Sequence, residues 1–147
     1  MTMTAIFADE ALLPGGWVRD VRLTLDGGRI ATIEQGAAAR VDDERCAVLL
    51  PTVANLHSHA FQRAMAGMAE VRGSEADTFW TWREVMYRHA LTMTPDHVEA
   101  VAAMLYVEML EAGFGRVGEF HYLHHDLVGR PYTDIGEMAA RIAAAAH

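Results

Sequence analysis

Val53-Ala54-Asn55-Leu56-His57-Ser58-His59 is the stretch of sequence that decides the fold. It follows the apolar run from Ala47 to Leu50, and together these runs are typical of strands buried on both faces in a parallel sheet. In a strand, residues i and i+2 point to the same face, so His57 and His59 project together, about 6 to 7 Å apart along the backbone. Two imidazoles placed in this way can share one metal ion, and neutral imidazole suits zinc.

The segments after the histidine pair predict two helices. An irregular loop is expected over 67–77, and Asp77 or Thr78 is expected to cap a helix that runs to about residue 91. Thr94 is a favourable N-cap for a second helix, because Pro95 fits its first position and Gly113 is a good stop signal.

A strand is expected over 117–123, followed by a helix over 138–146 that a capping box of Asp134 and Glu137 opens. The order strand, helices, strand, helix favours parallel βαβ units, so residues 51–147 are predicted to be α/β.

The first 50 residues predict a separate strand segment. Val21, Leu23 and Leu25 alternate with polar residues, which is the pattern of a strand with one buried face. Asp26-Gly27-Gly28 supplies a tight turn, and residues 30–33 form the returning strand of a hairpin. Residues 35–45 are expected to form a connecting loop. Two or three strands need a covering layer, so this segment is not expected to be a stable sheet alone.

Composition places the chain among globular proteins. The 147 residues are 52% hydrophobic, which argues against a disordered chain, and the formal charge of −8 argues against nucleic-acid and anionic-membrane partners. The single cysteine, Cys46, cannot form an internal disulfide. Neither a signal peptide nor an apolar run of 18 residues is apparent, so the sequence predicts a cytoplasmic protein with no membrane partner.

Three motifs resemble those of the formimidoylglutamate deiminase family of the amidohydrolase superfamily. In order along the chain they are NLHSHAFQR (55–63), FWTWREVMY (79–87) and GEFHYLHH (118–125). The first motif alone, with Pro51 four positions before Asn55, indicates only the superfamily, and the other two point to the deiminase family.

The resemblance implies the start of a (β/α)8 barrel over 51–147, preceded by strands over 1–50 that form part of a small composite β-sandwich. Such a barrel needs about 250 residues, so the barrel is expected to be incomplete in this chain. The implied metal ligands are His57 and His59, with one zinc ion as cofactor, and Gln62 and Tyr122 are the implied substrate-binding residues.

The implied reaction is hydrolysis of N-formimidoyl-L-glutamate to N-formyl-L-glutamate and ammonia, a step of histidine degradation. In the family a third metal histidine, a metal-binding aspartate, a proton-transferring glutamate and the cationic groups for the substrate come from later strands. No catalytic residue is therefore expected within this chain, which is expected to be an inactive fragment by itself. The resemblance allows a homodimer in the full-length form.

Other interpretations stay open at the level of the sequence. Gln62 suits a polar cap of the loop equally well, and Tyr122 suits a half-buried strand aromatic. Another superfamily aminohydrolase acting on a purine-like or pterin-like ring is an alternative. A small zinc-binding or interaction module is another, in which histidines of the 121–125 segment complete the metal site, although these histidines are better interpreted as loop residues.

Overall fold

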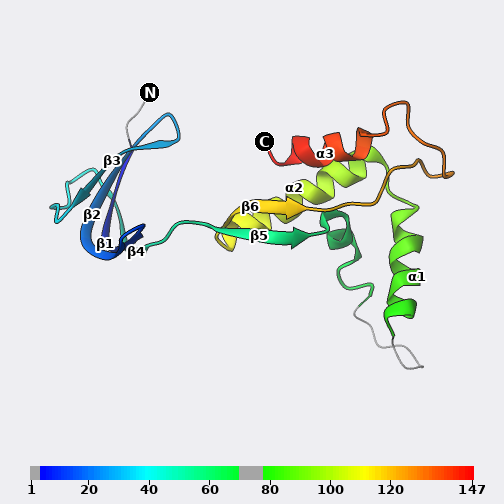
Figure 1. Ribbon diagram of the computed structural model, residues 1–147, viewed down its shortest axis with the longest axis horizontal. Helices are drawn as coiled ribbons and strands as arrows, with labels where there is room; N and C mark the ends of the chain where they lie inside the picture. Colours follow the sequence, from blue (N-terminus) through cyan, green and yellow to red (C-terminus); the bar gives the residue numbers. More distant parts are fainter. Residues whose placement is uncertain (1–3, 70–77) are drawn as a thin grey trace. The chain divides into compact units, whose positions relative to one another are not determined.

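The computed structural model describes residues 4–69 and 78–147, which divide between two units, Met1–Pro51 and Thr52–His147 (Figure 1). The first unit is a small β-sheet, and the second combines strands with helices. The expected mixed α/β class is confirmed at this level. The completion of the first unit as a sandwich, and of the second as a barrel, stays a prediction.

The first unit is a four-stranded sheet in the order β3-β2-β1-β4. Its strands are β1 (Thr4–Leu13), β2 (Gly16–Asp26), β3 (Arg29–Gln35) and β4 (Glu44–Leu49). β1, β2 and β3 pair antiparallel, whereas β4 pairs parallel with β1. The hairpin between β2 and β3 confirms the predicted turn, since Gly27 and Gly28 both take positive φ. Its buried apolar side chains include those of Ala8, Ala11, Val21 and Leu23, which form one core cluster.

An ion pair ties the loop before β4 to the centre of this sheet. The Arg22 guanidinium on β2 donates to both carboxylate oxygens of Asp43: Nη2 to Oδ1 at 2.8 Å, and Nε to Oδ2 at 2.9 Å and Oδ1 at 3.0 Å. The backbone N–H of Arg40 donates to the second carboxylate oxygen at 2.8 Å. These bonds, with the Arg22 bond first among them, lower the pKa of Asp43 below its ordinary value. The loop is thus anchored rather than merely connecting.

The second unit contains a parallel strand pair and three longer helices. Its elements are β5 (Val53–Ser58), the 3₁₀ helix η1 (Ala60–Met65), α1 (Phe79–Ala90), α2 (Pro95–Glu111), β6 (Phe114–Glu119) and α3 (Glu137–Ala145). β5 and β6 lie side by side and run in the same direction, and α2 contacts β6, η1 and α3 (Figure 1). Its core includes Phe61, Met86, Val98 and Met138.

The predicted helix starts are confirmed where local chemistry sets them. Thr78 caps α1 and Thr94 caps α2, each by accepting from the backbone N–H three residues on. Asp77 and most of the predicted loop, residues 70–77, lie outside the described residues. Gly113 takes a φ of 86° just after α2, as a helix stop requires.

Three predictions about the fold are wrong. β6 spans Phe114–Glu119 rather than 117–123, because pairing with β5 begins directly after α2, where Val53 N–H donates to the Gly113 carbonyl. The Asp134 capping box is absent: Asp134 accepts from Gly136 N–H, only two residues on, and the Glu137 carboxylate accepts from Arg141. A carboxylate bound so locally forms an Asx turn instead of a cap.

The third error concerns burial. β4 and β5 were expected to be buried on both faces, but Val48 is 51% exposed and Leu56 is 84% exposed. Among the described residues β4 pairs with β1 alone and β5 with β6 alone, so each strand has one free edge and little covers its faces. Within the same described part of the chain, no helix is both long and apolar enough to cross a membrane.

The Arg22–Asp43 pair predicts a pH-dependent contribution to stability. Because the folded pKa of Asp43 is lowered, the pair stabilises the fold above the ordinary pKa of about 3.9 and loses this effect as the pH falls through the folded pKa. Asp43→Asn should lower the thermal unfolding midpoint at pH 7, with a shrinking difference toward pH 3. Asp42→Asn, at the exposed neighbour, is the control, and an equal loss at both pH values would contradict the assignment.

Candidate metal and substrate site

The two histidines converge at the carboxyl end of β5. His57 Nε2 and His59 Nε2 are 3.1 Å apart, and the ring centroids are separated by 4.7 Å at a near-perpendicular angle of 82°. His57 lies in β5, whereas His59 directly follows the strand as the N-cap of η1. The two rings nevertheless lean toward each other, so the side chains project together as the sequence predicted. His57 is exposed and His59 is half-buried, so the pair opens to solvent.

The backbone of β6 orients the second ring. His59 Nδ1 lies 2.7 Å from the Phe120 carbonyl oxygen, which can only accept a hydrogen bond. Nδ1 therefore carries the proton, and Nε2 of His59 keeps its lone pair. A histidine that ligates a metal generally donates its other N–H in this way, which fixes the tautomer and the ring orientation.

The spacing of the two nitrogens fits one tetrahedral metal ion. Zinc–nitrogen bonds of roughly 2.0–2.1 Å at tetrahedral angles place two ligand nitrogens about 3.3 Å apart. The separation of 3.1 Å between His57 Nε2 and His59 Nε2 is close to this value. Two ligands are fewer than the three of a catalytic zinc site, and the described residues contain no group of three or more metal-binding side chains. The pair therefore fits as part of a metal site.

The two predicted substrate-binding residues meet beside His59. Gln62 on η1 donates from Nε2 to the Tyr122 hydroxyl at 2.9 Å, and that hydroxyl donates to Met86 Sδ at 2.8 Å. The Tyr122 ring packs edge-on against His59, with centroids 5.7 Å apart. Tyr122 lies beyond the end of β6, not within a strand as predicted. The structure thus brings all four predicted site residues together, although it does not test their roles.

A pocket of about 290 Å³ adjoins this group, with His59, Gln62 and Tyr122 in its lining. The other lining residues come from α1 and are Phe79, Trp82, Arg83, Met86 and Tyr87. Arg83 donates to the Tyr87 hydroxyl at 3.1 Å, and its guanidinium lies over the Tyr87 ring, 4.6 Å from the centroid. Sequence reasoning missed Arg83 because helical spacing indicated only packing for its neighbours.

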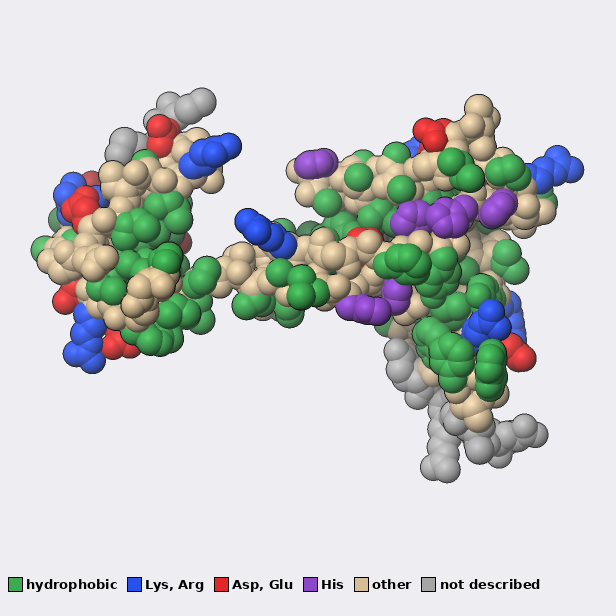
Figure 2. Space-filling model, in the orientation of Figure 1, with side chains coloured by type: hydrophobic (Ala, Val, Ile, Leu, Met, Phe, Trp, Pro, Cys, Tyr) green, Lys and Arg blue, Asp and Glu red, His purple; other side chains and the backbone are tan. Residues whose placement is uncertain are grey.

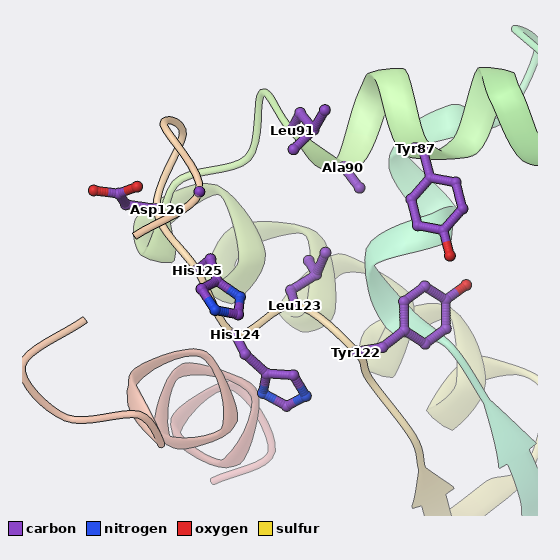
Figure 3. Close-up of a pocket in the computed structure, with 9 residues that line it drawn as sticks. Tyr87, Ala90, Leu91, Tyr122, Leu123, His124, His125 and Asp126 are labelled. Atoms are coloured by element: carbon purple, nitrogen blue, oxygen red, sulfur yellow. The ribbon is translucent and has the colours of Figure 1, made fainter. Parts of the chain in front are cut away.

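Two histidines of the 121–125 segment, His124 and His125, line a neighbouring pocket of about 250 Å³. Figure 3 shows His124 and His125 following Tyr122 along the chain, with α1 residues lining the same pocket. Histidine side chains gather on this face of the second unit, among hydrophobic side chains (Figure 2). The His121 and His124 rings are 5.0 Å apart, and burial, with a smaller effect of His124, lowers the pKa of His121.

Comparison with known proteins identifies close relatives of the chain. A family model described as the N-terminal domain of formimidoylglutamate deiminase HutF matches residues 3–47. A formimidoylglutamate deiminase from Pseudomonas aeruginosa is 52% identical over 98% of the chain, which spans 32% of that protein. A crystal structure of an amidohydrolase from Brucella melitensis matches 97% of the chain at 62% identity, with a TM-score of 0.88, and again the chain covers 32% of it. The chain therefore spans about a third of the length of these relatives.

More distant structures share the fold alone. Atrazine chlorohydrolase TrzN from Arthrobacter aurescens, in complex with zinc, is 18% identical with a TM-score of 0.70, and the match covers 98% of this chain and 33% of TrzN. An adenosine deaminase from Xanthomonas campestris with bound zinc is 19% identical with a TM-score of 0.61, and the match covers 96% of this chain and 31% of that protein. Zinc is thus present in solved structures of the same fold.

The converging nitrogens predict that the chain binds zinc through this pair. Replacing either His57 or His59 by alanine should weaken zinc binding at least tenfold, because a single imidazole then remains at the end of β5. The affinity is measured by competition with a chromophoric chelator. The double variant His124→Ala/His125→Ala is the matched control and should bind as the unchanged chain does. The reverse order of affinities would instead support a metal module built on the 121–125 segment.

Proposed function

We propose that this chain supplies part of the active site of a metal-dependent deiminase. The proposal starts from its match to the N-terminal region of formimidoylglutamate deiminase, in the amidohydrolase superfamily. The substrate is N-formimidoyl-L-glutamate, and the products are N-formyl-L-glutamate and ammonia. His57 and His59 provide two of the metal ligands, and Gln62 and Tyr122 contact the substrate. We expect no turnover by the chain alone, because its described residues hold no group of three metal-binding side chains.

The observation that carries the proposal is that the four residues lie together at the carboxyl end of β5, where three of them, His59, Gln62 and Tyr122, line one pocket. The facing Nε2 atoms of the histidine pair lie beside the Gln62–Tyr122 hydrogen bond, and His59 contributes to both groups. A zinc ion bound at such a site would lower the pKa of water to about 7, which would supply a hydroxide nucleophile near neutral pH. The residues of this chain then have to bind and orient the substrate.

Two kinds of group in the pocket suit a dicarboxylate with a C=N bond. The Gln62 amide and the Tyr122 hydroxyl offer uncharged hydrogen-bond partners close to the metal pair. The Arg83 guanidinium, at the α1 side of the same pocket, offers a cation for a carboxylate. This arginine favours an anionic substrate over the neutral purine-like ring of the alternative aminohydrolase, since a neutral ring leaves the cation without a counter-charge.

The experiment that tests the function is a chimera. This chain replaces the matching first third of the Pseudomonas aeruginosa relative, and ammonia release is measured with N-formimidoyl-L-glutamate and with adenosine. We expect turnover of the formimidoyl substrate by the zinc-loaded chimera, no turnover of adenosine, and none by the 147-residue chain with zinc. Enzyme-like turnover by the chain alone, or a preference of the chimera for adenosine, would contradict the proposal.

Arg83 should control substrate affinity in the same chimera. Arg83→Met removes a charge-assisted hydrogen bond worth about 1.5–3 kcal/mol, so KM should rise roughly 10- to 100-fold. Arg88→Met, at an exposed position of α1, is the matched control and should leave KM unchanged. An unchanged KM in the Arg83 variant would show that the carboxylates are bound elsewhere.

A further inference from the structure

The end of β6 is bound to the end of β5 at the histidine pair itself. Ser58, between the two histidines, is the register partner of Glu119, and the Phe120 N–H donates to the Ser58 carbonyl at 2.9 Å. Gly118 permits this close approach, because a Cβ there would lie 3.1 Å from the Leu56 carbonyl oxygen. The geometry of the histidine pair, His57 and His59, is therefore set by the residues at the end of β6.

Glu119 adds a side-chain contact to this pairing. Its Oε1 accepts from the backbone N–H of Ala60 at 2.7 Å, and Ala60 is fully buried directly after His59. The next residue, Phe120, accepts from His59 Nδ1 through its carbonyl. Two consecutive residues at the end of β6 thus fix the position of His59. Glu119 binds the peptide that follows it, and Phe120 binds its ring.

Glu119 is half-buried. Its second oxygen, Oε2, is buried, and so is the Ser58 hydroxyl. On the α2 side lies Tyr106, which is 9% exposed, and burial together with the Glu119 charge raises the pKa of Tyr106 to about 12. Burying a carboxylate costs free energy unless its contacts compensate, so its bond to Ala60 matters for the local structure.

We infer that Glu119 is a positioning residue for the metal pair: by holding the Ala60 peptide, it keeps His59 Nε2 converged on His57 Nε2. Neither the residue patterns nor the relatives' names assign it a role. The inference rests on the proposed function only in taking zinc as the ion that the pair binds. What matters physically is the length of the Glu119 side chain, because its carboxylate has to extend far enough from β6 to accept from the Ala60 N–H.

Two conservative variants of the 147-residue chain separate the effect of the side-chain length of Glu119 from the effect of its charge. Glu119→Gln keeps the length and an accepting oxygen but loses the charge, whereas Glu119→Asp keeps the charge and is one methylene shorter. Zinc affinity is measured by chelator competition. We expect Glu119→Gln to bind within about threefold of the unchanged chain, and Glu119→Asp to bind about 10- to 100-fold more weakly, which is the usual effect of losing a group that orients a ligand.

A second readout follows the contact without metal. Hydrogen exchange of the Ala60 amide should accelerate in Glu119→Asp and stay slow in Glu119→Gln. Glu99→Asp and Glu99→Gln, at a carboxylate of α2 that pairs with Arg141, are the matched controls and should change neither readout. Thermal unfolding of each variant separates a local effect from loss of the fold.

The outcomes for this inference and for the proposed function are distinct. If Glu119→Asp binds zinc as the unchanged chain does, or if Glu119→Gln loses as much affinity as Glu119→Asp, the positioning role is overturned while the metal ligands stand. If the unchanged chain binds no zinc, the proposed ligands fail, and unchanged Ala60 exchange in Glu119→Asp then refutes the contact as well.

Discussion

The hydrogen bond between His59 Nδ1 and the Phe120 carbonyl, 2.7 Å long, is the constraint on which the site depends. It joins residues 61 positions apart, so it exists only when β5 and β6 pair. Because a carbonyl accepts and never donates, the contact decides which nitrogen of His59 carries the proton. It also leaves Nε2 directed at His57, beside the Tyr122 ring. The orientation of the two histidine rings, and the position of the proton on His59, therefore depend on strand pairing.

Sequence reasoning succeeded where a single segment determines the outcome. The i, i+2 spacing was enough to predict that His57 and His59 project together, since it needs no knowledge of the neighbouring strand, although β5 ends one residue before His59. The helix starts at Thr78 and Thr94 were predictable for the same reason, because each cap bonds to the third residue after it. The motif resemblance added the family and the pairing of Gln62 with Tyr122 in one site.

Sequence reasoning failed where the partner is distant or is a backbone atom. The Phe120 carbonyl has no signature in the sequence, because every residue carries one, and the Ala60 N–H that Glu119 binds has none either. From the sequence, Arg83 is one polar residue of a packing helix, and only the structure places it in the lining of the pocket. The exposure of Leu56 was also unpredictable, since the pattern of a doubly buried strand says nothing about whether covering elements lie within the same chain.

The central claim is that His57 and His59 bind one metal ion through their Nε2 atoms while the Phe120 carbonyl holds the proton on His59 Nδ1. Nitrogen-15 NMR of the imidazole rings, without and with one equivalent of zinc, tests it most directly. The account predicts a His59 that is protonated at Nδ1 in both states, with zinc shifting the Nε2 resonances of His57 and His59. A His59 protonated at Nε2 before zinc is added, or a zinc-induced shift confined to His121, His124 and His125, would contradict it.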